Sequence, residues 1–337
     1  MIPKRRIMPI FIPHAGCEHD CVFCDQRRIS GTVESISIIE SAKKQIVNFN
    51  VGSDPAEIAF YGGSFTAIPV KQQCELLEAA QPFLRQNQLN SIRISTRPDC
   101  LDACIIRRLQ SYGVTTVELG AQSMCDDVLY ASQRGHLAYD IERAAELVRD
   151  SGLALILQMM TGLPEDTREK SLYTANRFIE LRPDGVRIYP TVVVRGTKLH
   201  ELWKRGDYQE HEIGYAVELC AELYLLFREA GIPVIRLGLN PSRTLSSGDA
   251  VAGAYHPAFG ELVYSRVYYN AAVTLLQGVA EGSDITLAVA AGRVSMMTGQ
   301  RRCNINMLKQ KFSLRSIRII QTELQPEELV AVFREKD

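Results

Sequence analysis

Short apolar runs alternate with amphipathic stretches over the first half of the chain. Runs that are apolar nearly throughout are typical of parallel strands buried on both faces, and apolar positions at helical spacing are typical of the helices that cover them. The pattern predicts strands at residues 6–13, 57–61, 91–95, 116–119, 154–159 and 185–189. It predicts helices between them at residues 34–49, 70–88, 101–111, 141–150 and 167–181.

Polar or glycine-rich segments follow nearly every predicted strand. Repeated β-α units favour parallel strands with right-handed connections, and in β/α barrels the working residues lie on the loops at the carboxyl ends of the strands. We therefore predict an α/β fold, a partial (β/α)6 TIM-like barrel rather than a flat doubly wound sheet. The polar segments would all face one mouth of this barrel.

The second half of the chain changes in composition near residue 240. A predicted helix and strand precede a segment rich in Ser, Gly, Asn and Pro, which is typical of a linker or flexible lid. A compact β-α-β pattern follows. These elements are a helix at 212–230, a strand at 234–237, the linker at 240–253, a strand from 284, a helix at 301–311 and a strand at 316–320. We predict a barrel domain at residues 1–244 and a small C-terminal α/β domain, a substrate or lid domain, at 245–337.

Composition restricts the class of protein. The chain has 337 residues, of which 46% are hydrophobic and 23% charged, so a globular fold is expected rather than disorder. A formal net charge of −1 gives no overall attraction to nucleic acid or to an anionic membrane. The sequence begins without a recognisable signal peptide and contains no apolar run of about 20 residues, so we expect a cytoplasmic protein.

Three of the nine cysteines, Cys17, Cys21 and Cys24, lie close together with the spacing C-x3-C-x2-C. Nine is an odd number and the other six are scattered, which disfavours a disulfide framework. Structural zinc usually takes four protein ligands, and cubane iron–sulfur clusters are normally held by four cysteines. Three cysteines therefore indicate a [4Fe-4S] cluster with one iron open to a ligand such as S-adenosyl-L-methionine (SAM). This spacing resembles the signature of the radical SAM superfamily, whose clusters are oxygen-sensitive.

Two other interpretations of the cysteines stay open at this point. Zinc could bind with His14 or His19 as the fourth ligand. Alternatively, the three thiols could be structural, although core cysteines rarely lie in a loop rich in Gly, His and Asp.

Two further motifs follow predicted strands. Gly62, Gly63 and Ser64 form a turn after the second strand, where backbone groups could approach the methionyl part of SAM; the alternative is a plain tight turn. After the third strand, Thr96 and Arg97 could reach the carboxylate or ribose of SAM, while Asp99 could simply cap the next helix.

The fourth predicted strand contains a buried charge. Glu118 lies in an otherwise apolar run, where a carboxylate is costly unless it is paired. It is therefore either a ligand group in the barrel interior or the partner of a structural ion pair. Gln122, at the end of the strand, could bind ribose or substrate, and Arg134 could pair with Glu118 or with the carboxylate of SAM.

Several segments together resemble the radical SAM core of the Elongator catalytic subunit family. They are CEHDCVFC (17–24), FYGGSFTAIP (60–69), STRPD (95–99), GVTTVELGAQS (113–123), RGH (134–136), MMTGLP (159–164) and RIYPTVVVRGTKLHELWKRGDY (187–208). The resemblance implies that Cys17, Cys21 and Cys24 hold the cluster. It implies SAM contacts from Gly62, Gly63, Ser64, Thr96, Gln122 and Arg134. In that family the substrate is the wobble uridine of tRNA.

The chain departs from this family after residue 208, where no acetyl-CoA-binding loop is present, and it lacks a strongly basic N-terminal extension. We expect a stand-alone radical SAM enzyme that acts with a one-electron donor of the flavodoxin or ferredoxin type. Its substrate would be an RNA base or, alternatively, a small molecule or peptide, as in anaerobic coproporphyrinogen oxidase. A non-catalytic metal-binding module is a remote alternative. Residues 254–261 could line a substrate pocket, and residues 299–306 could bind an anion.

Overall fold

The computed structural model describes residues 6–12, 17, 20–25, 38–48 and 56–333 of the chain. The chain divides into two compact units. The first comprises Met1–Glu212 and Phe227–Tyr255, and the second comprises Ile213–Leu226 and His256–Asp337.

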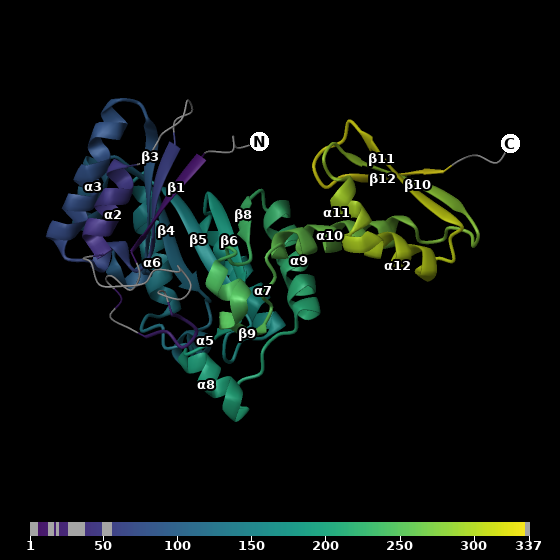
Figure 1. Cartoon of the computed structure of the whole chain (residues 1–337), viewed down its shortest axis with the longest axis horizontal. Coiled ribbons are helices and arrows are strands. Elements are labelled where there is room, and N and C mark those ends of the chain that lie inside the picture. The colour runs from purple at the N-terminus through teal and green to yellow at the C-terminus, as the bar shows by residue number, and fades with distance from the viewer. Residues whose placement is uncertain (1–5, 13–16, 18–19, 26–37, 49–55, 334–337) are drawn as a thin grey trace. The chain divides into compact units, whose positions relative to one another are not determined.

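The first unit is built on one sheet of seven parallel strands, which curls into a half-barrel (Figure 1). In spatial order the strands are β1 (Arg6–Ile12), β2 (Ala56–Gly62), β3 (Leu89–Thr96), β4 (Val114–Gln122), β5 (Ala154–Thr161), β6 (Gly185–Pro190) and β8 (Val234–Leu237). The predicted α/β partial barrel is confirmed. The seventh strand, β8, was predicted as a strand but not as a member of the barrel.

Helices cover the outer side of this sheet (Figure 1). They are α2 (Ile38–Val47), α3 (Val70–Arg85), α4 (Ala103–Ser111), α6 (Ala138–Asp150) and α7 (Arg168–Leu181). In α6, Ile141, Ala144, Ala145 and Val148 recur at helical spacing and are all buried, because they form the apolar stripe that packs on β4 and β5.

The start of α4 corrects one interpretation from the sequence. Asp102, not Asp99, caps this helix, and its carboxylate accepts a hydrogen bond of 2.7 Å from the backbone N–H of Ile105. Two short helices, α5 (Asp126–Ala131) and α8 (Lys198–Arg205), were not predicted.

A two-stranded ribbon completes the first unit. Strand β7 (Val192–Val194) pairs antiparallel with β9 (Ala250–Gly253), which lies within the segment interpreted as a linker or lid. Gly253 has φ +87°, and a Cβ there would lie 2.8 Å from the carbonyl oxygen of Thr191, so the close pairing of the two strands requires glycine.

The second unit contains a three-stranded sheet in the order β11-β10-β12. Strands β10 (Asp284–Ala290) and β11 (Ser316–Thr322) are parallel and are joined through α11 (Val294–Thr298) and α12 (Cys303–Lys311), as the β-α-β pattern predicted. Strand β12 (Leu329–Phe333) adds an antiparallel edge. The core of this unit contains Tyr268 of α10 (Phe259–Leu275), Leu287 of β10 and Leu308 of α12. The long α9 (Ile213–Glu229) contributes its first part to the same unit.

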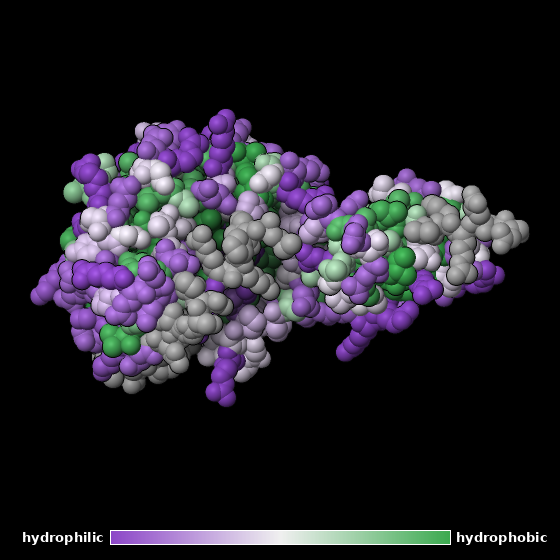
Figure 2. All heavy atoms as spheres, turned by 90° about the horizontal axis from the view of Figure 1, so that it is seen from above, coloured by the Kyte–Doolittle hydropathy of each residue, from purple (hydrophilic) through white to green (hydrophobic). Residues whose placement is uncertain are grey.

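Hydrophilic residues cover most of the face in Figure 2, with small apolar areas between them. Among the helices that the structure describes, none combines the length and the apolar character needed to cross a bilayer.

The core of the second unit depends on one buried amide. Asn304 is 3% exposed, and its Nδ2 lies within hydrogen-bond distance of the Ser265 carbonyl and hydroxyl oxygens and of the carbonyl oxygens of Met296 and Met297. We expect Asn304→Ala to destabilise this unit by about 1–3 kcal/mol, because it leaves buried acceptors without a donor. Faster amide exchange across α12 and β10, measured by mass spectrometry, would show this. Asn306→Ala, at an exposed position of the same helix, is the control; equal exchange in both variants would contradict the assignment.

Candidate functional site

A cavity of about 610 Å³ opens at the carboxyl ends of the strands in the first unit. All the residues that the sequence predicts to bind the cluster or SAM line it, although they come from segments far apart in the chain, whereas no residue of 254–261 or 299–306 does. The predicted residues in its lining are Cys17, Cys21, Cys24, Gly62, Gly63, Ser64, Thr96, Arg97, Glu118, Gln122 and Arg134. The structure thus brings all eleven together, while their individual roles as ligands stay predictions.

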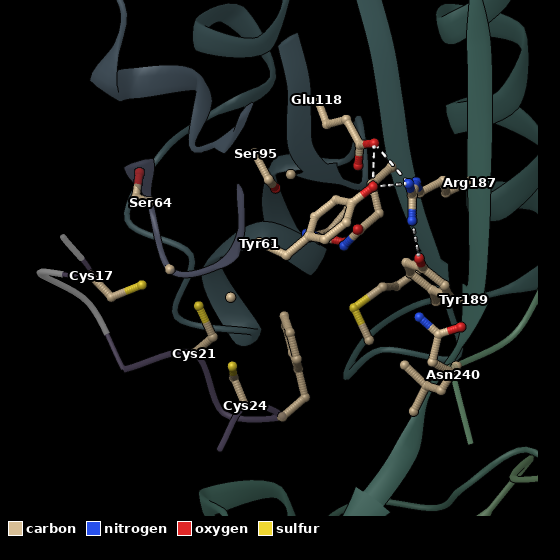
Figure 3. Close-up of a pocket in the computed structure, with 18 of the residues that line it drawn as sticks. Cys17, Cys21, Cys24, Tyr61, Ser64, Ser95, Glu118, Arg187, Tyr189 and Asn240 are labelled. Carbon is tan, nitrogen blue, oxygen red and sulfur yellow. Dashed lines mark hydrogen bonds and ion pairs between the residues drawn. The ribbon is translucent and has the colours of Figure 1, made fainter. Parts of the chain in front are cut away.

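The three cysteines lie along one side of this cavity (Figure 3). Two backbone hydrogen bonds hold their loop: Val22 N–H donates to the Ser132 carbonyl at 3.2 Å, and Leu199 N–H donates to the Val22 carbonyl at 2.7 Å. The loop also shares an apolar cluster with the β7–β9 ribbon and α8. This cluster contains Val22, Phe23, Val193, Leu199, Leu202, Trp203, Tyr208, Val251 and Ala252.

The donor set of this loop fits a [4Fe-4S] cluster. None of the nine cysteines forms a disulfide, so the three thiols are chemically available. Cys17 is exposed to solvent, yet desolvation raises the pKa of its thiol, against the lowering effect of a hydrogen bond from the backbone of Ser64. Iron binding would displace the thiol proton and so overcome the raised pKa of Cys17.

Within the described part of the chain, no three Cys, His, Asp or Glu side chains converge as ligands of one metal ion. A cubane does not need such convergence, because each thiolate binds a different iron. His14 and His19, the ligands considered for zinc, lie outside the described residues.

The glycine turn after β2 brings backbone close to the cavity. Gly62 has φ +108°, and a Cβ there would lie 3.2 Å from backbone atoms of Ile12, so a side chain is excluded. A chain of hydroxyl groups supports the turn: the oxygen of Thr96 lies 2.8 Å from that of Ser64 and 2.6 Å from that of Thr66. The Ser64 hydroxyl also accepts from the backbone N–H of Arg97 at 3.1 Å. Strands β2 and β3 are therefore tied together where both reach the cavity.

A bulge interrupts the pairing of β4 with β5 between Leu119 and Gln122. Gln122 adopts φ +73°, which is costly for a residue other than glycine and is typical of functional positions. Its side-chain oxygen accepts a hydrogen bond of 3.1 Å from Gln158 of β5. The bulge thus places the Gln122 amide at the cavity wall.

Two arginines approach the cysteines. Arg134 donates from Nη1 to the sulfur of Cys21 at 3.0 Å and from Nη2 to the carbonyl of Gly120. Its pairing with Glu118, one of the two alternatives considered, is not what the structure shows. The second arginine, Arg97, forms a bidentate ion pair with Asp99: its Nε and Nη2 donate to the two carboxylate oxygens at 2.9 and 2.8 Å. Although burial opposes it, this pair holds the pKa of the Asp99 carboxyl below its usual value.

His136 is buried behind these arginines. Burial and the charges of Arg134 and Arg97 lower its pKa to about 3, so the ring is neutral at physiological pH. It therefore adds no charge beside the cysteines.

Glu118 is the centre of a buried ion-pair network on the inner side of the sheet. It accepts from Arg93 Nη1 and from Arg187 Nη2, both at 2.7 Å, and Arg93 also pairs with Glu57 at 2.8 Å. Of the two alternatives for this residue, the structure shows the ion pair, while Glu118 also lines the cavity. Burial lowers the pKa of Arg93, but the paired Glu118 and Glu57 outweigh burial and raise it.

Two tyrosines extend this network into the cavity (Figure 3). Arg187 donates to the hydroxyl of Tyr61 at 2.7 Å and to that of Tyr189 at 3.1 Å. Burial raises the pKa of Tyr61, and Glu118 adds to this effect, so the phenol stays protonated at neutral pH.

Arg93, Arg187 and Tyr189 were missed as site residues in the sequence. The signal that singled out Glu118, a charged residue within an apolar strand, is also present in the runs SIRIS and GVRIYP. A search for positive as well as negative charges within apolar strands would have found the two arginines. Asn240, which also lines the cavity, had no such signal, because it lies in a segment rich in polar residues.

Comparisons with known proteins agree with the motifs. A family model described as Radical SAM superfamily matches residues 11–177, and one described as Radical SAM C-terminal domain matches residues 183–269. Elongator complex protein 3 of Bos taurus is 29% identical over 247 residues, which cover 66% of this chain and 44% of that protein. The tRNA uridine(34) acetyltransferase of Methanocaldococcus infernus is 28% identical over 235 residues, covering 63% and 42%. The chain thus spans less than half the length of either relative.

Solved structures show the same fold. The archaeal Methanocaldococcus infernus Elp3 with an N-terminal deletion superposes with a TM-score of 0.60 and 24% identity, covering 79% of this chain and 64% of that one. Coproporphyrinogen III oxidase from Escherichia coli, described as a radical SAM enzyme, gives a TM-score of 0.50 at 18% identity, covering 68% and 54%.

The ion-pair network predicts a specific loss of stability. Glu118→Gln keeps the shape of the side chain but leaves the buried Arg187 without a carboxylate partner among the described residues and leaves Arg93 with Glu57 alone. We expect the free energy of unfolding of the first unit to fall by about 3–5 kcal/mol. Urea unfolding followed by the fluorescence of Trp203, the single tryptophan of the chain, measures this.

The matched control is Glu201→Gln, which removes an exposed partner of Lys204 and should leave unfolding unchanged. Similar unfolding curves for the two variants would show that Glu118 does not hold the barrel interior.

Proposed function

This chain belongs to the radical SAM superfamily, and on that premise we propose that it cleaves SAM reductively at a [4Fe-4S] cluster held by Cys17, Cys21 and Cys24. The observation that supports the proposal most is that all three thiols and the predicted SAM contacts line one cavity. With the cluster bound, one electron from a flavodoxin- or ferredoxin-type donor breaks a carbon–sulfur bond of SAM, yielding methionine and a 5′-deoxyadenosyl radical that takes a hydrogen atom from the substrate.

The residues of the chain bind and orient SAM in this proposal. Backbone groups of Gly62 and Gly63 accept from its amino group. The charge of Arg134, which has no carboxylate partner within the described residues, attracts the carboxylate of SAM beside the cysteines. The Gln122 amide, held by Gln158, contacts ribose, and the hydroxyl chain of Ser64 and Thr96 fixes the turn.

For the substrate we propose an RNA base. The relatives named Elongator complex protein 3 and tRNA uridine(34) acetyltransferase support this choice, although the chain matches only part of their length. Radical chemistry on a small molecule or a peptide is the alternative, and the second unit is a candidate for binding the substrate in either case.

Anaerobic reconstitution with iron and sulfide, reduction with dithionite and addition of SAM test the proposal. We expect 5′-deoxyadenosine and methionine in equal amounts, detected by mass spectrometry. Cys21→Ser should lose the cluster absorbance and reduce 5′-deoxyadenosine to background, because one iron loses its ligand.

Cys104→Ser, an exposed cysteine outside the cavity, is the control and should behave as the unmodified chain. A reconstituted, reduced protein that binds iron and sulfide but makes no 5′-deoxyadenosine would support the non-catalytic binding module instead.

A further inference from the structure

The cavity has two chemically different sides. In Figure 3 the three cysteines lie on one side, while Arg187, Tyr189 and Asn240 lie on the other. Because the proposed function assigns the cysteine side to SAM, the opposite side is where a substrate would be held. We call it the distal wall, formed by Tyr61, Glu118, Arg187, Tyr189 and Asn240.

The charges of the distal wall cancel within the protein. Two guanidinium groups, Arg93 and Arg187, face two carboxylates, Glu57 and Glu118, at 2.7–2.8 Å. Both terminal nitrogens of Arg187 are engaged, and its Nε is buried without a partner among the described residues, where no ligand can reach it. The wall therefore offers a ligand neither a free cation nor a free anion.

A nearby arginine, Arg236, brings a further positive charge but no hydrogen-bond donor into the cavity. Arg236 of β8 donates from Nε to the carbonyl of Gly238 at 3.0 Å and from Nη2 to that of Leu239 at 3.1 Å, and it does not line the cavity. The arginine that lines the cavity without a carboxylate partner in the described structure is Arg134, and it lies beside Cys21. Among the residues that line the cavity, a direct ion pair with an anion is thus confined to the cysteine side.

Two neutral groups of the distal wall keep hydrogen-bonding capacity for a ligand. The hydroxyl oxygen of Tyr189 accepts from Arg187, so its proton is left to donate, and no other partner of this hydroxyl is found among the described residues. The side-chain amide of Asn240, which also lines the cavity, has no hydrogen-bond partner among the described residues. It supplies two donors and one acceptor. The amide of Asn240 can pair with both the C=O and the N–H of an amide group, and Tyr189 can donate a further hydrogen bond.

The aromatic residues around these groups suit a flat ligand. The rings of Phe11 and Tyr61 lie 6.1 Å apart at 40°, and both line the cavity. The guanidinium of Arg187 lies 5.1 Å from the centre of the Tyr61 ring and holds it in place. A planar ring fits such surroundings better than a flexible chain does.

We infer that the distal wall binds an uncharged, planar amide, lactam or imide of the substrate and rejects a carboxylate. A carboxylate brought there would lose its hydration without gaining a direct ion pair, which is unfavourable. The inference rests on the proposed function. It separates substrates such as a nucleobase or a peptide amide from polycarboxylates such as a porphyrinogen.

Three small probes that share one ring test this inference. They are uracil, which is a neutral cyclic imide; orotate, which is uracil carrying a carboxylate; and 1,3-dimethyluracil, whose N–H groups are blocked. Binding to the reconstituted full chain, saturated with SAM, is measured by saturation-transfer NMR. We expect uracil to bind at least about tenfold more tightly than orotate, and 1,3-dimethyluracil to bind more weakly than uracil.

Variants of the wall locate the site. Asn240→Ala and Tyr189→Phe should each weaken the binding of uracil about 3- to 10-fold, as expected for the loss of one hydrogen bond. The controls Asn306→Ala and Tyr130→Phe lie outside the cavity at exposed positions and should change nothing.

Orotate binding as tightly as uracil, no uracil binding, or unchanged binding in both wall variants would each overturn the inference. The same protein samples are assayed for 5′-deoxyadenosine. Loss of probe selectivity with SAM cleavage intact counts against the distal wall alone, whereas absent cleavage with selectivity intact counts against the proposed function alone.

Discussion

One carboxylate holds the interior of the half-barrel together. Glu118 of β4 accepts from Arg93 of the neighbouring β3 and from Arg187 of β6, which lies beyond β5 in the sheet. Side chains two strands apart meet in this way because the sheet is curled. A buried charge without its partner costs several kcal/mol, so the network favours one curvature over flatter arrangements. The width of the cavity depends on this curvature.

Residues that the chain spaces widely converge at the carboxyl end of the sheet for the same reason. The glycine turn after β2, the hydroxyl of Thr96 on β3 and the bulge of β4 each occur where a parallel strand ends. The carboxyl ends of parallel strands lie at the same edge of the sheet, and this alone brings these groups together. The positive φ of Gln122 is tolerated because Gln158 and the flanking strands hold that residue in place.

Much of this arrangement could be predicted from the sequence, because it depends on local signals. The parallel strands follow from apolar runs, and the cavity residues follow from motifs at strand ends. What could not be predicted depends on contacts across the sheet. Glu118 was recognised as an anomaly, and Arg93 and Arg187 also stand out as charges within apolar strands. That these three residues pair with one another is fixed by register and curvature, which no local pattern records. Strand β9 was missed because it is too short and too rich in Ala and Gly to differ from a loop.

The shared apolar cluster between the cysteine loop and the β7–β9 ribbon has a thermodynamic consequence. Val22 of the cysteine loop lies in one cluster with Val193 of β7, and Val251 of β9 packs against that cluster. The backbone N–H of Leu199 donates to the carbonyl of Val22. Two segments that stabilise each other through one set of contacts obey reciprocity. Whatever orders the cysteine loop therefore stabilises the ribbon, and whatever orders the ribbon stabilises the loop by the same free energy.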